Sequence, residues 1–240
     1  MFIQEVTAAR PTRQHRARAS RAEPPGAQGG AAGAGDFAPF ADASPQERRI
    51  LDAALDLFVE RGYHATTIPE IARRAGLAAG TIYLYFPGKE QLVTALLTRV
   101  RGALARELAE ALPRPRGTRA EFEALWAVFA RFALSCERAL AFCDLHHHTP
   151  YAGPEASAVW DPAKARLRAH FAAGRRAGLY RDLPPDVLRA VVAGTLLGVH
   201  KFARAGELVL SAGLLDEARE MAWRAVTRQG PPQKGRTQCR

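Results

Sequence analysis

The sequence predicts an all-α protein with about nine helices, arranged as an N-terminal three-helix domain of the helix-turn-helix type and a larger helical domain. After residue 43, every periodic apolar segment repeats at the three-to-four-residue spacing of a helix, and none alternates as a strand does. Glycine and proline fall between these segments, where helices end and begin. We expect four regions: a disordered tail rich in Arg, Gly, Ala and Pro at 1–43, the helix-turn-helix domain at 44–92, the second domain at 93–228 and a basic tail at 229–240.

Composition and charge limit the class of protein. The chain of 240 residues has a net charge of +10, but residues 44–92 hold six basic and six acidic side chains and are neutral. The total charge is therefore weak support for nucleic-acid binding. The odd count of three cysteines argues against a disulfide scaffold, and no apolar run has the length of a signal peptide or a membrane span. We expect a cytoplasmic protein without a membrane partner.

The first two helices have well-marked ends. Ser44, followed by Pro45 and by Glu47 three residues after the cap, is a pattern typical of a helix start, and we expect this helix to end at Gly62. A second helix starts at a capping box formed by Thr67 and Glu70, and it stops at Gly76. The predicted inward stripes are Ile50, Ala54, Leu57 and Phe58 in the first helix, and Ile68, Ile71, Ala72 and Ala75 in the second.

A third short helix, about 79–86, lies within the segment GLAAGTIYLYFPGKEQL. Ile82 and Phe86, four residues apart, should pack onto the first two helices. Two short helices joined by a glycine-containing turn form a helix-turn-helix, whose second helix fits the major groove of DNA. Small outer residues let that helix approach the bases, and hydroxyl or ammonium groups can bind phosphates. The residues expected on the outer side are Ala79, Gly80, Thr81, Tyr83 and Tyr85.

Six further helices are expected in the second domain, at about 89–112, 119–136, 138–148, a segment ending before Gly178, 185–204 and 214–228. The helix that ends before Gly178 starts at either Pro154 or Pro162, and a start at Pro154 would place a kink at Pro162. Residues 187–199 are apolar nearly all round, which indicates a buried helix.

Three motifs in the order ALDLFVERGY, ATTIPEIARRAG and GTIYLYFPGKEQL run almost without a gap through residues 50–93. In these motifs the chain resembles the DNA-binding domain of the tetracycline-repressor-like (TetR/AcrR) transcriptional regulators. The resemblance implies a repressor released from a palindromic DNA operator by an apolar or amphipathic small-molecule effector. It also implies a homodimer, which would supply the second reading helix that a specific site needs, and it implies neither enzymatic activity nor a cofactor.

The resemblance also implies roles for individual residues. Thr67 and Lys89 would contact phosphates, Ala79 and Gly80 would approach bases, and three further residues, Thr81, Tyr83 and Tyr85, would contact the backbone and groove. Ala78 and Ala79 replace residues that are more often polar in such proteins, so we expect added support from Arg48 and Arg49. The expected dimer interface is Val191, Gly194, Thr195, Gly198, Leu214, Ala218 and Met221.

An aromatic stripe on 119–136 is consistent with either core or the wall of an effector pocket. The candidate pocket residues are Phe122, Trp126, Phe129, Phe142, His146 and His147. The segment CDLHHHTPY contains Cys143, Asp144 and His146–His148 at spacings that would also suit a metal site, although a helix end beside a pocket is favoured. Two alternatives to an effector-controlled repressor remain: a DNA-binding regulator without effector, and a metal-dependent enzyme built on residues 143–148. The arginines of the N-terminal tail either enter the minor groove or, as we favour, are solvated.

Overall fold

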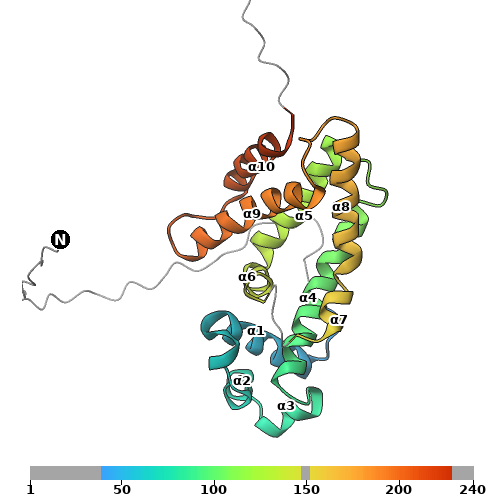
Figure 1. Ribbon diagram of the computed structural model, residues 1–240. Coiled ribbons are helices and arrows are strands. Elements are labelled where there is room, and N and C mark those ends of the chain that lie inside the picture. The colour runs from blue at the N-terminus through green and yellow to red at the C-terminus, as the bar shows by residue number, and fades with distance from the viewer. Residues whose placement is uncertain (1–38, 147–151, 229–240) are drawn as a thin grey trace, which may run out of the picture. The chain divides into compact units, whose positions relative to one another are not determined.

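The computed structural model describes residues 39–146 and 152–228, and these form ten α-helices with one isolated bridge between Tyr180 and Thr227 (Figure 1). The helices are α1 (Pro45–Ala65), α2 (Ile68–Ala75), α3 (Ala79–Tyr85), α4 (Lys89–Ala111), α5 (Arg119–Ser135), α6 (Glu137–Leu145), α7 (Pro154–Ala158), α8 (Asp161–Arg176), α9 (Pro185–Arg204) and α10 (Ala212–Val226). The all-helical prediction is confirmed. No helix in the described ranges has the length and apolar character needed to cross a membrane.

Helices α1, α2 and α3 form the expected three-helix unit. The Ser44 hydroxyl accepts a hydrogen bond from the Glu47 N–H at 3.3 Å, and the Glu70 carboxylate accepts from the Thr67 N–H at 3.0 Å. Gly76 has a φ of 65°, which ends α2 in the left-handed conformation that favours glycine. Ile50, Ile71 and Ile82, one from each helix, are fully buried together with the other predicted inward residues.

Two helix ends differ from the sequence-based expectation. Gly62 has a φ of 80°, but a further turn continues α1 to Ala65 beyond a kink at this glycine. Both Pro154 and Pro162 lie in the first turn of a helix, because the single helix expected here is two helices, α7 and α8. Proline has no N–H to lose at a helix start, so each can open a helix without breaking one.

Helix α4 joins the three-helix unit to the rest of the described chain. It packs against α1 and, farther along, against α5, α6, α7 and α8 (Figure 1). Its apolar positions Leu92, Leu96 and Val100 are fully buried. Arg101 on the same helix is also buried, and its guanidinium donates to the Ala156 carbonyl of α7 at 2.9 Å and to the His146 carbonyl at the end of α6 at 3.3 Å. The buried side of α4 therefore carries both apolar and charged contacts.

Helix α9 is covered on one side only. Leu188, Val192 and Leu196 are buried, whereas Val187 and Val191 are 43% and 38% exposed. Within the chain, the predicted burial of this helix holds for one side only, because no other described element covers its second side.

A buried polar cluster connects α5, α8 and the segment that follows α8. The His170 imidazole lies 3.1 Å from the Glu121 carboxylate through Nδ1 and 2.6 Å from the Tyr180 hydroxyl through Nε2. Burial lowers the pKa of His170, so the neutral ring donates from Nδ1 and accepts from Tyr180. The Glu121 carboxylate also accepts from the N–H groups of Gly117 and Thr118, which fixes the loop before α5.

Removing the Tyr180 hydroxyl should destabilise the fold. Tyr180→Phe leaves Nε2 of the buried His170 without its donor, which costs about 1–3 kcal/mol of the free energy of unfolding. The same change at Tyr83, which is 54% exposed, should cost less than about 0.5 kcal/mol. Urea unfolding of the two variants measures the difference, and equal losses would contradict the structural role of the cluster.

The end of α6 packs onto α1 through aromatic rings. The Phe142 ring lies 6.0 Å from Phe58, and the His146 imidazole lies 4.5 Å from Phe142 and 6.3 Å from Phe58, measured between ring centroids. Burial, with Arg101 close by, lowers the pKa of His146 from 6.5 to about 4. His146 is therefore neutral in the folded protein at neutral pH.

The free energy of unfolding should decrease as the pH is lowered, because of this histidine. The unfolded chain takes up the proton near pH 6.5 and the folded chain only near pH 4, so the stabilisation is present above pH 6.5 and is lost as the pH decreases toward 4. We expect His146 to account for a loss of roughly 2 kcal/mol between pH 7 and pH 5. Urea unfolding at both pH values should show a smaller loss for His146→Phe than for the wild type. The same loss in both proteins would refute the assignment.

Candidate nucleic-acid interface and ligand cavity

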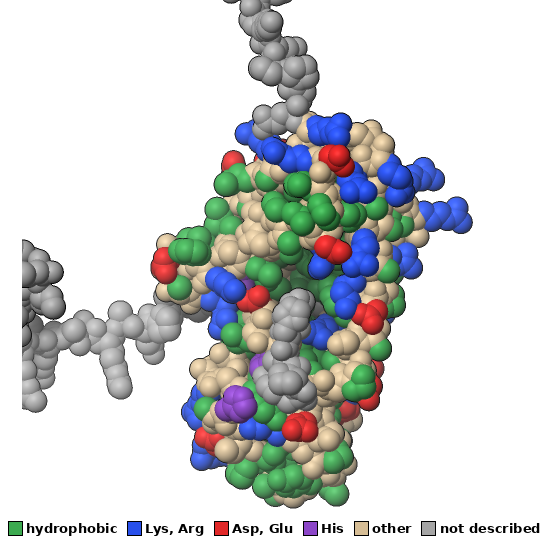
Figure 2. Space-filling view, viewed as in Figure 1, with side chains coloured by type: hydrophobic (Ala, Val, Ile, Leu, Met, Phe, Trp, Pro, Cys, Tyr) green, Lys and Arg blue, Asp and Glu red, His purple; other side chains and the backbone are tan. Residues whose placement is uncertain are grey.

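The outer face of α3 is apolar and open to solvent. A helix turns by about 100° per residue, so Gly80 and Leu84 lie on the side opposite the fully buried Ile82. Leu84 is 84% exposed and Tyr83 is 54% exposed. Figure 2 shows apolar side chains gathered at the lower end of the molecule, over α3. Leu84 is not among the residues expected from the sequence on the outer side, although its spacing of two from Ile82 already places it there.

Gly80 is not required by packing within the chain. Its backbone is helical, and apart from its chain neighbours and the nearby backbone of its own helix no heavy atom lies within 4 Å of the position that a β-carbon would occupy. A glycine inside a helix is less favourable than alanine by about 1 kcal/mol. The free surface around Gly80 therefore leaves room for another molecule to approach the helix closely.

The hydroxyl groups predicted at this interface are partly engaged within the chain. The Tyr85 hydroxyl donates to the Gln46 side chain of α1 at 3.1 Å, and the Thr67 hydroxyl donates to the Glu70 carboxylate at 2.8 Å. Both residues remain exposed, whereas Ala79 and Thr81 are half-buried. Contacts of these residues with phosphates and bases stay predictions.

The three side chains predicted as basic contacts all donate to carbonyls within the chain, and their contacts with DNA stay predictions. The Lys89 ammonium donates to the carbonyls of Tyr63 at 2.9 Å and Thr66 at 3.0 Å and lies 4.2 Å from the centre of the Tyr63 ring. Lys89 thus holds the start of α4 to the end of α1. The guanidinium of Arg48 donates to the Phe40 carbonyl at 2.8 Å.

Arg49 is bound still more tightly to the fold. Its guanidinium donates to the carbonyls of Ala75 at 2.6 Å and Gly76 at 3.0 Å, so it caps the end of α2 at the turn of the helix-turn-helix. A β-carbon on Gly76 would come within 2.8 Å of this group. The side chain therefore sets the turn between α2 and α3, which the sequence pattern alone did not indicate.

An apolar cavity of about 190 Å³ lies in the second domain. It is lined by residues of α4, α5, α6, α8 and α9, together with Trp160. Trp126 and Phe129 line it as predicted. Further apolar walls come from Leu104, Leu125, Leu140, Leu167, Phe171, Val192, Ala193, Leu196 and Leu197.

The other predicted pocket residues do not line this cavity. Phe122 is fully buried, and its ring centre lies 6.4 Å from that of Trp126 and 4.9 Å from that of Trp223. Phe142 and the His146 imidazole face α1 instead, where their rings meet Phe58. These three residues therefore do not line this cavity, because a helical aromatic stripe does not distinguish a core contact from a cavity wall. His147 lies outside the described residues.

The residues proposed for a metal site are used in other ways. Burial raises the pKa of the Cys143 thiol to about 12, which disfavours the thiolate that binds metals. The Asp144 carboxylate forms an ion pair with Lys201 of α9 at 3.1 Å. Within residues 39–146 and 152–228, no three His, Cys, Asp or Glu side chains are grouped to hold a metal ion; His148 falls between these ranges.

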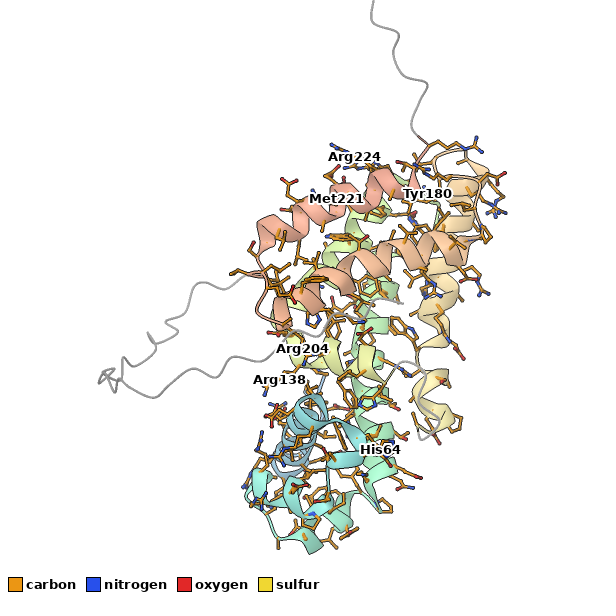
Figure 3. The ribbon with its side chains drawn as sticks, turned by 60° about the vertical axis from the view of Figure 1, so that its left-hand side comes forward. His64, Arg138, Tyr180, Arg204, Met221 and Arg224 are labelled. Carbon is orange, nitrogen blue, oxygen red and sulfur yellow. The ribbon has the colours of Figure 1, made fainter. Side chains whose placement is uncertain are left out.

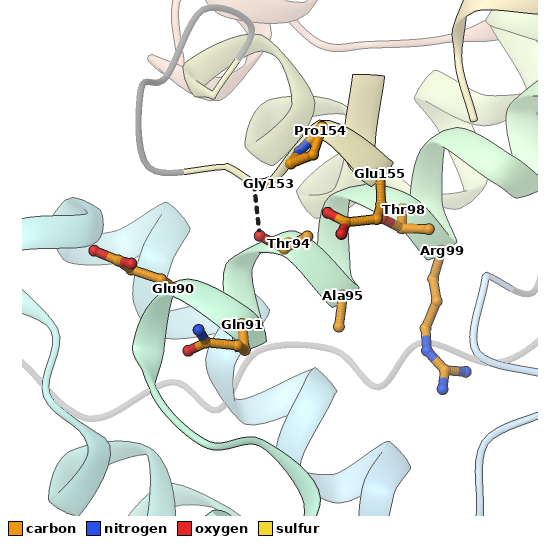
Figure 4. A pocket seen from close by; sticks show the side chains of 9 residues that line it. All are labelled: Glu90, Gln91, Thr94, Ala95, Thr98, Arg99, Gly153, Pro154 and Glu155. Atoms are coloured by element: carbon orange, nitrogen blue, oxygen red, sulfur yellow. Dashed lines mark hydrogen bonds between the residues drawn. The ribbon is translucent and has the colours of Figure 1, made fainter. Parts of the chain in front are cut away.

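A second hollow, of about 530 Å³, lies between the first half of α4 and the start of α7 (Figure 4). The Gly153 N–H donates to the Thr94 hydroxyl at 2.9 Å across it. This hollow is larger than the apolar cavity but more open, and its lining includes Glu90, Arg99 and Glu155. Small molecules bind best in enclosed apolar sites, and the lining of the cavity around Trp126 is closer to this description.

The predicted dimer face is mostly accessible on α9 and α10. Val191 and Gly194 are exposed, and Thr195, Gly198 and Leu214 are partly exposed. Met221 is 67% exposed and projects from α10 near Arg224 (Figure 3).

Ala218 is an exception and corrects the prediction for α10. It is buried within its own chain, because the inward stripe of α10 contains Leu215, Ala218, Ala222 and Val226. The predicted stripe lies to one side of this set, so Ala218 cannot contribute to an exposed face.

Comparison with known proteins agrees with this architecture. The family model described as "Bacterial regulatory proteins, tetR family" matches residues 50–96, and the one described as "Tetracyclin repressor-like, C-terminal domain" matches residues 98–228. The crystal structure of a TetR family transcription regulator from Marinobacter aquaeolei VT8 has the same fold, with a TM-score of 0.66 and 23% identity. The superposition covers 77% of this chain and 96% of that one.

Curated relatives match over shorter or more distant stretches. The fatty acid metabolism regulator protein of Bacillus subtilis strain 168 is 39% identical over 66 residues, which are 28% of this chain and 34% of the relative. The uncharacterized HTH-type transcriptional regulator YdgC of the same organism is 28% identical over 175 residues, or 71% of this chain and 84% of the relative. The chain thus spans only about a third of the length of the first of these relatives. Since the C-terminal family model alone covers more than half of the chain, the protein belongs to the TetR family of DNA-binding transcriptional regulators.

Proposed function

We propose that the protein is a cytoplasmic repressor that binds a palindromic operator as a homodimer and is released by a small molecule bound in the cavity around Trp126. The observation that carries the DNA-binding part is the outer face of α3. Gly80 leaves space that nothing in the chain fills, and Leu84 and Tyr83 are exposed beside it. Such a surface suits close approach to base edges, including the apolar thymine methyl group.

The three-helix unit must bind DNA without a large excess of positive charge. Residues 44–92 are neutral, and Lys89, Arg48 and Arg49 already donate to carbonyls within the chain. Arg61 and Arg74 are paired with Glu70 and Glu60. We infer that hydroxyl groups, backbone N–H groups and the shape of α3 contribute more to binding than phosphate–cation pairs do.

Dimerisation is inferred from the uncovered side of α9. An apolar helix that its own chain covers on one side only is expected to bury the other side against a partner. Gly194 and Gly198, four residues apart, have no heavy atom within 4 Å of their β-carbon positions, so a helix from a second protomer can approach closely. A dimer also supplies two reading helices for a two-fold symmetric site.

Release by an effector is inferred from what connects the cavity to α1. Arg101 lines the cavity and donates to the His146 carbonyl at the end of α6. Helix α6 in turn packs on α1 through Phe142, and Arg138 of α6 is paired with Asp56 of α1. A ligand that prefers one arrangement of these elements would shift the spacing of the two reading helices by its difference in affinity.

The second candidate is a regulator that needs no effector. It differs from the first only in whether a small molecule changes the affinity for DNA. The cavity, with its aromatic and aliphatic walls, favours the first candidate.

Gly80→Ala should separate DNA binding from folding. The fold should be as stable as the wild type or up to about 1 kcal/mol more stable, whereas operator affinity should fall at least about tenfold, or about 1.4 kcal/mol. Thermal unfolding and fluorescence anisotropy, with an operator selected from a random DNA pool, measure the two effects. Gly213→Ala, the same change at the second residue of α10, serves as the control. Unchanged affinity in Gly80→Ala would refute the role of α3.

Met221→Glu should weaken the dimer, because it places a charge on the proposed apolar contact. We expect a shift toward monomer at micromolar concentration in sedimentation experiments, with a parallel loss of operator affinity. Leu134→Glu changes another exposed apolar side chain, on α5, and should leave the dimer intact. A wild-type protein that sediments as a monomer would reject the proposed dimer.

A further inference from the structure

Arg101 is a buried cation without a carboxylate partner among the residues that the structure describes. Its side chain is 8% exposed and lines the apolar cavity. The Arg101 guanidinium donates hydrogen bonds to the backbone carbonyls of Ala156 and His146. It also lies within hydrogen-bonding reach of the Cys143 thiol. A guanidinium has more N–H donors than these groups use. A buried charge is normally paired, because carbonyl dipoles offset only part of the cost of removing it from water.

A second residue of the cavity wall, Trp126, carries a donor without a partner among the described residues. Trp126 is 2% exposed, and its indole Nε1 is buried without an acceptor among the described residues. A buried donor without an acceptor lowers the stability of the fold by on the order of 1–3 kcal/mol, unless a ligand or a water molecule accepts its hydrogen bond.

Acceptors in the cavity wall are few. Asp144 is the carboxylate that lines the cavity, and it is already paired with Lys201 of α9. Arg189 adds another positive charge to the lining and lies 3.5 Å from Asp186. Apart from Asp144, which is paired with Lys201, and the Cys143 thiol, the polar groups of the cavity are donors or positively charged, and the remaining wall is apolar.

We propose that the ligand of this cavity is a small amphipathic acid, whose anionic head accepts hydrogen bonds from Arg101 and Trp126 and whose apolar part packs against Phe129, Leu167 and Phe171. This inference rests on the proposed function, since it names the chemical class of the effector. The cavity of about 190 Å³ is smaller than the roughly 300–1,000 Å³ of drug-sized sites, which favours a compact molecule with a single head group.

Three probes of equal length and different head group test the proposal: octanoate, 1-octanol and octylamine. Titration calorimetry on the full chain should give an affinity for octanoate at least about tenfold higher than for either analogue. Arg101→Gln should remove this preference. Arg106→Gln makes the same change at an exposed position of α4 that does not line the cavity, and it should keep the preference.

A second variant, Trp126→Phe, tests the proposal even if Arg101→Gln does not fold. Trp126→Phe keeps an aromatic ring but removes the N–H, so octanoate should bind several-fold more weakly while the affinity for 1-octanol stays unchanged. The proposal is overturned if octanoate does not bind the wild type, if 1-octanol or octylamine binds equally well, or if the preference survives in Arg101→Gln.

Operator release separates the two levels of inference. If octanoate binds with the expected preference but leaves the DNA complex intact, the ligand class stands and effector-controlled release fails. If 1-octanol or octylamine releases the DNA and octanoate does not, release stands and the acidic ligand is rejected. If octanoate releases operator DNA from the wild type but not from Arg101→Gln, both the ligand class and effector-controlled release are supported.

Discussion

The contacts of α4 with the ends of other helices are the constraint on which the rest of this structure depends. Lys89, at the start of α4, donates to carbonyls at the end of α1, and Arg101, about three turns later, donates to the carbonyl at the end of α6. A cation near a helix C-terminus is favourable because unpaired carbonyls and the helix dipole concentrate negative charge there. Helix α6 packs on α1 through Phe58 and Phe142, so α1, α4 and α6 form a closed triangle. This triangle fixes the position of α1, and it thereby fixes that of α3, because α3 packs on the unit formed by α1 and α2.

This arrangement explains why basic residues near a DNA-binding helix need not be DNA contacts. In a domain of fewer than fifty residues, few side chains are long enough to reach across the core surface and bond a carbonyl on another helix. Arginine and lysine meet this need. Here they hold the turn before α3 and the start of α4. The excess positive charge lies mainly outside residues 44–92.

Local signals in the sequence predicted the helices and the helix-turn-helix well. Caps such as Ser44 and Gly76 act within a few residues, and the inward stripes of α1 and α2 repeat over several turns. The errors in the assignment of side-chain contacts depend on contacts between distant segments. The sequence could not show that the Lys89 ammonium would donate to carbonyls at the end of α1. Nor could it show that Phe142 would face α1 rather than the cavity. For α10, the predicted dimer face and the observed buried stripe lie about one residue apart, and Ala218 belongs to both sets. Arg101 carried no local signal, because it occupies an otherwise apolar helix face.

The uncovered side of α9 would make DNA binding depend on the concentration of the protein. Under the proposed dimer, the amount of DNA-binding species at low expression rises with the square of the protomer concentration, because two chains must meet before the apolar side is covered. Operator occupancy then changes more steeply than the amount of protein. A modest fall in synthesis would be enough to free the operator without any ligand, so the same helix face that gives two-fold symmetry would also set a threshold of expression for repression.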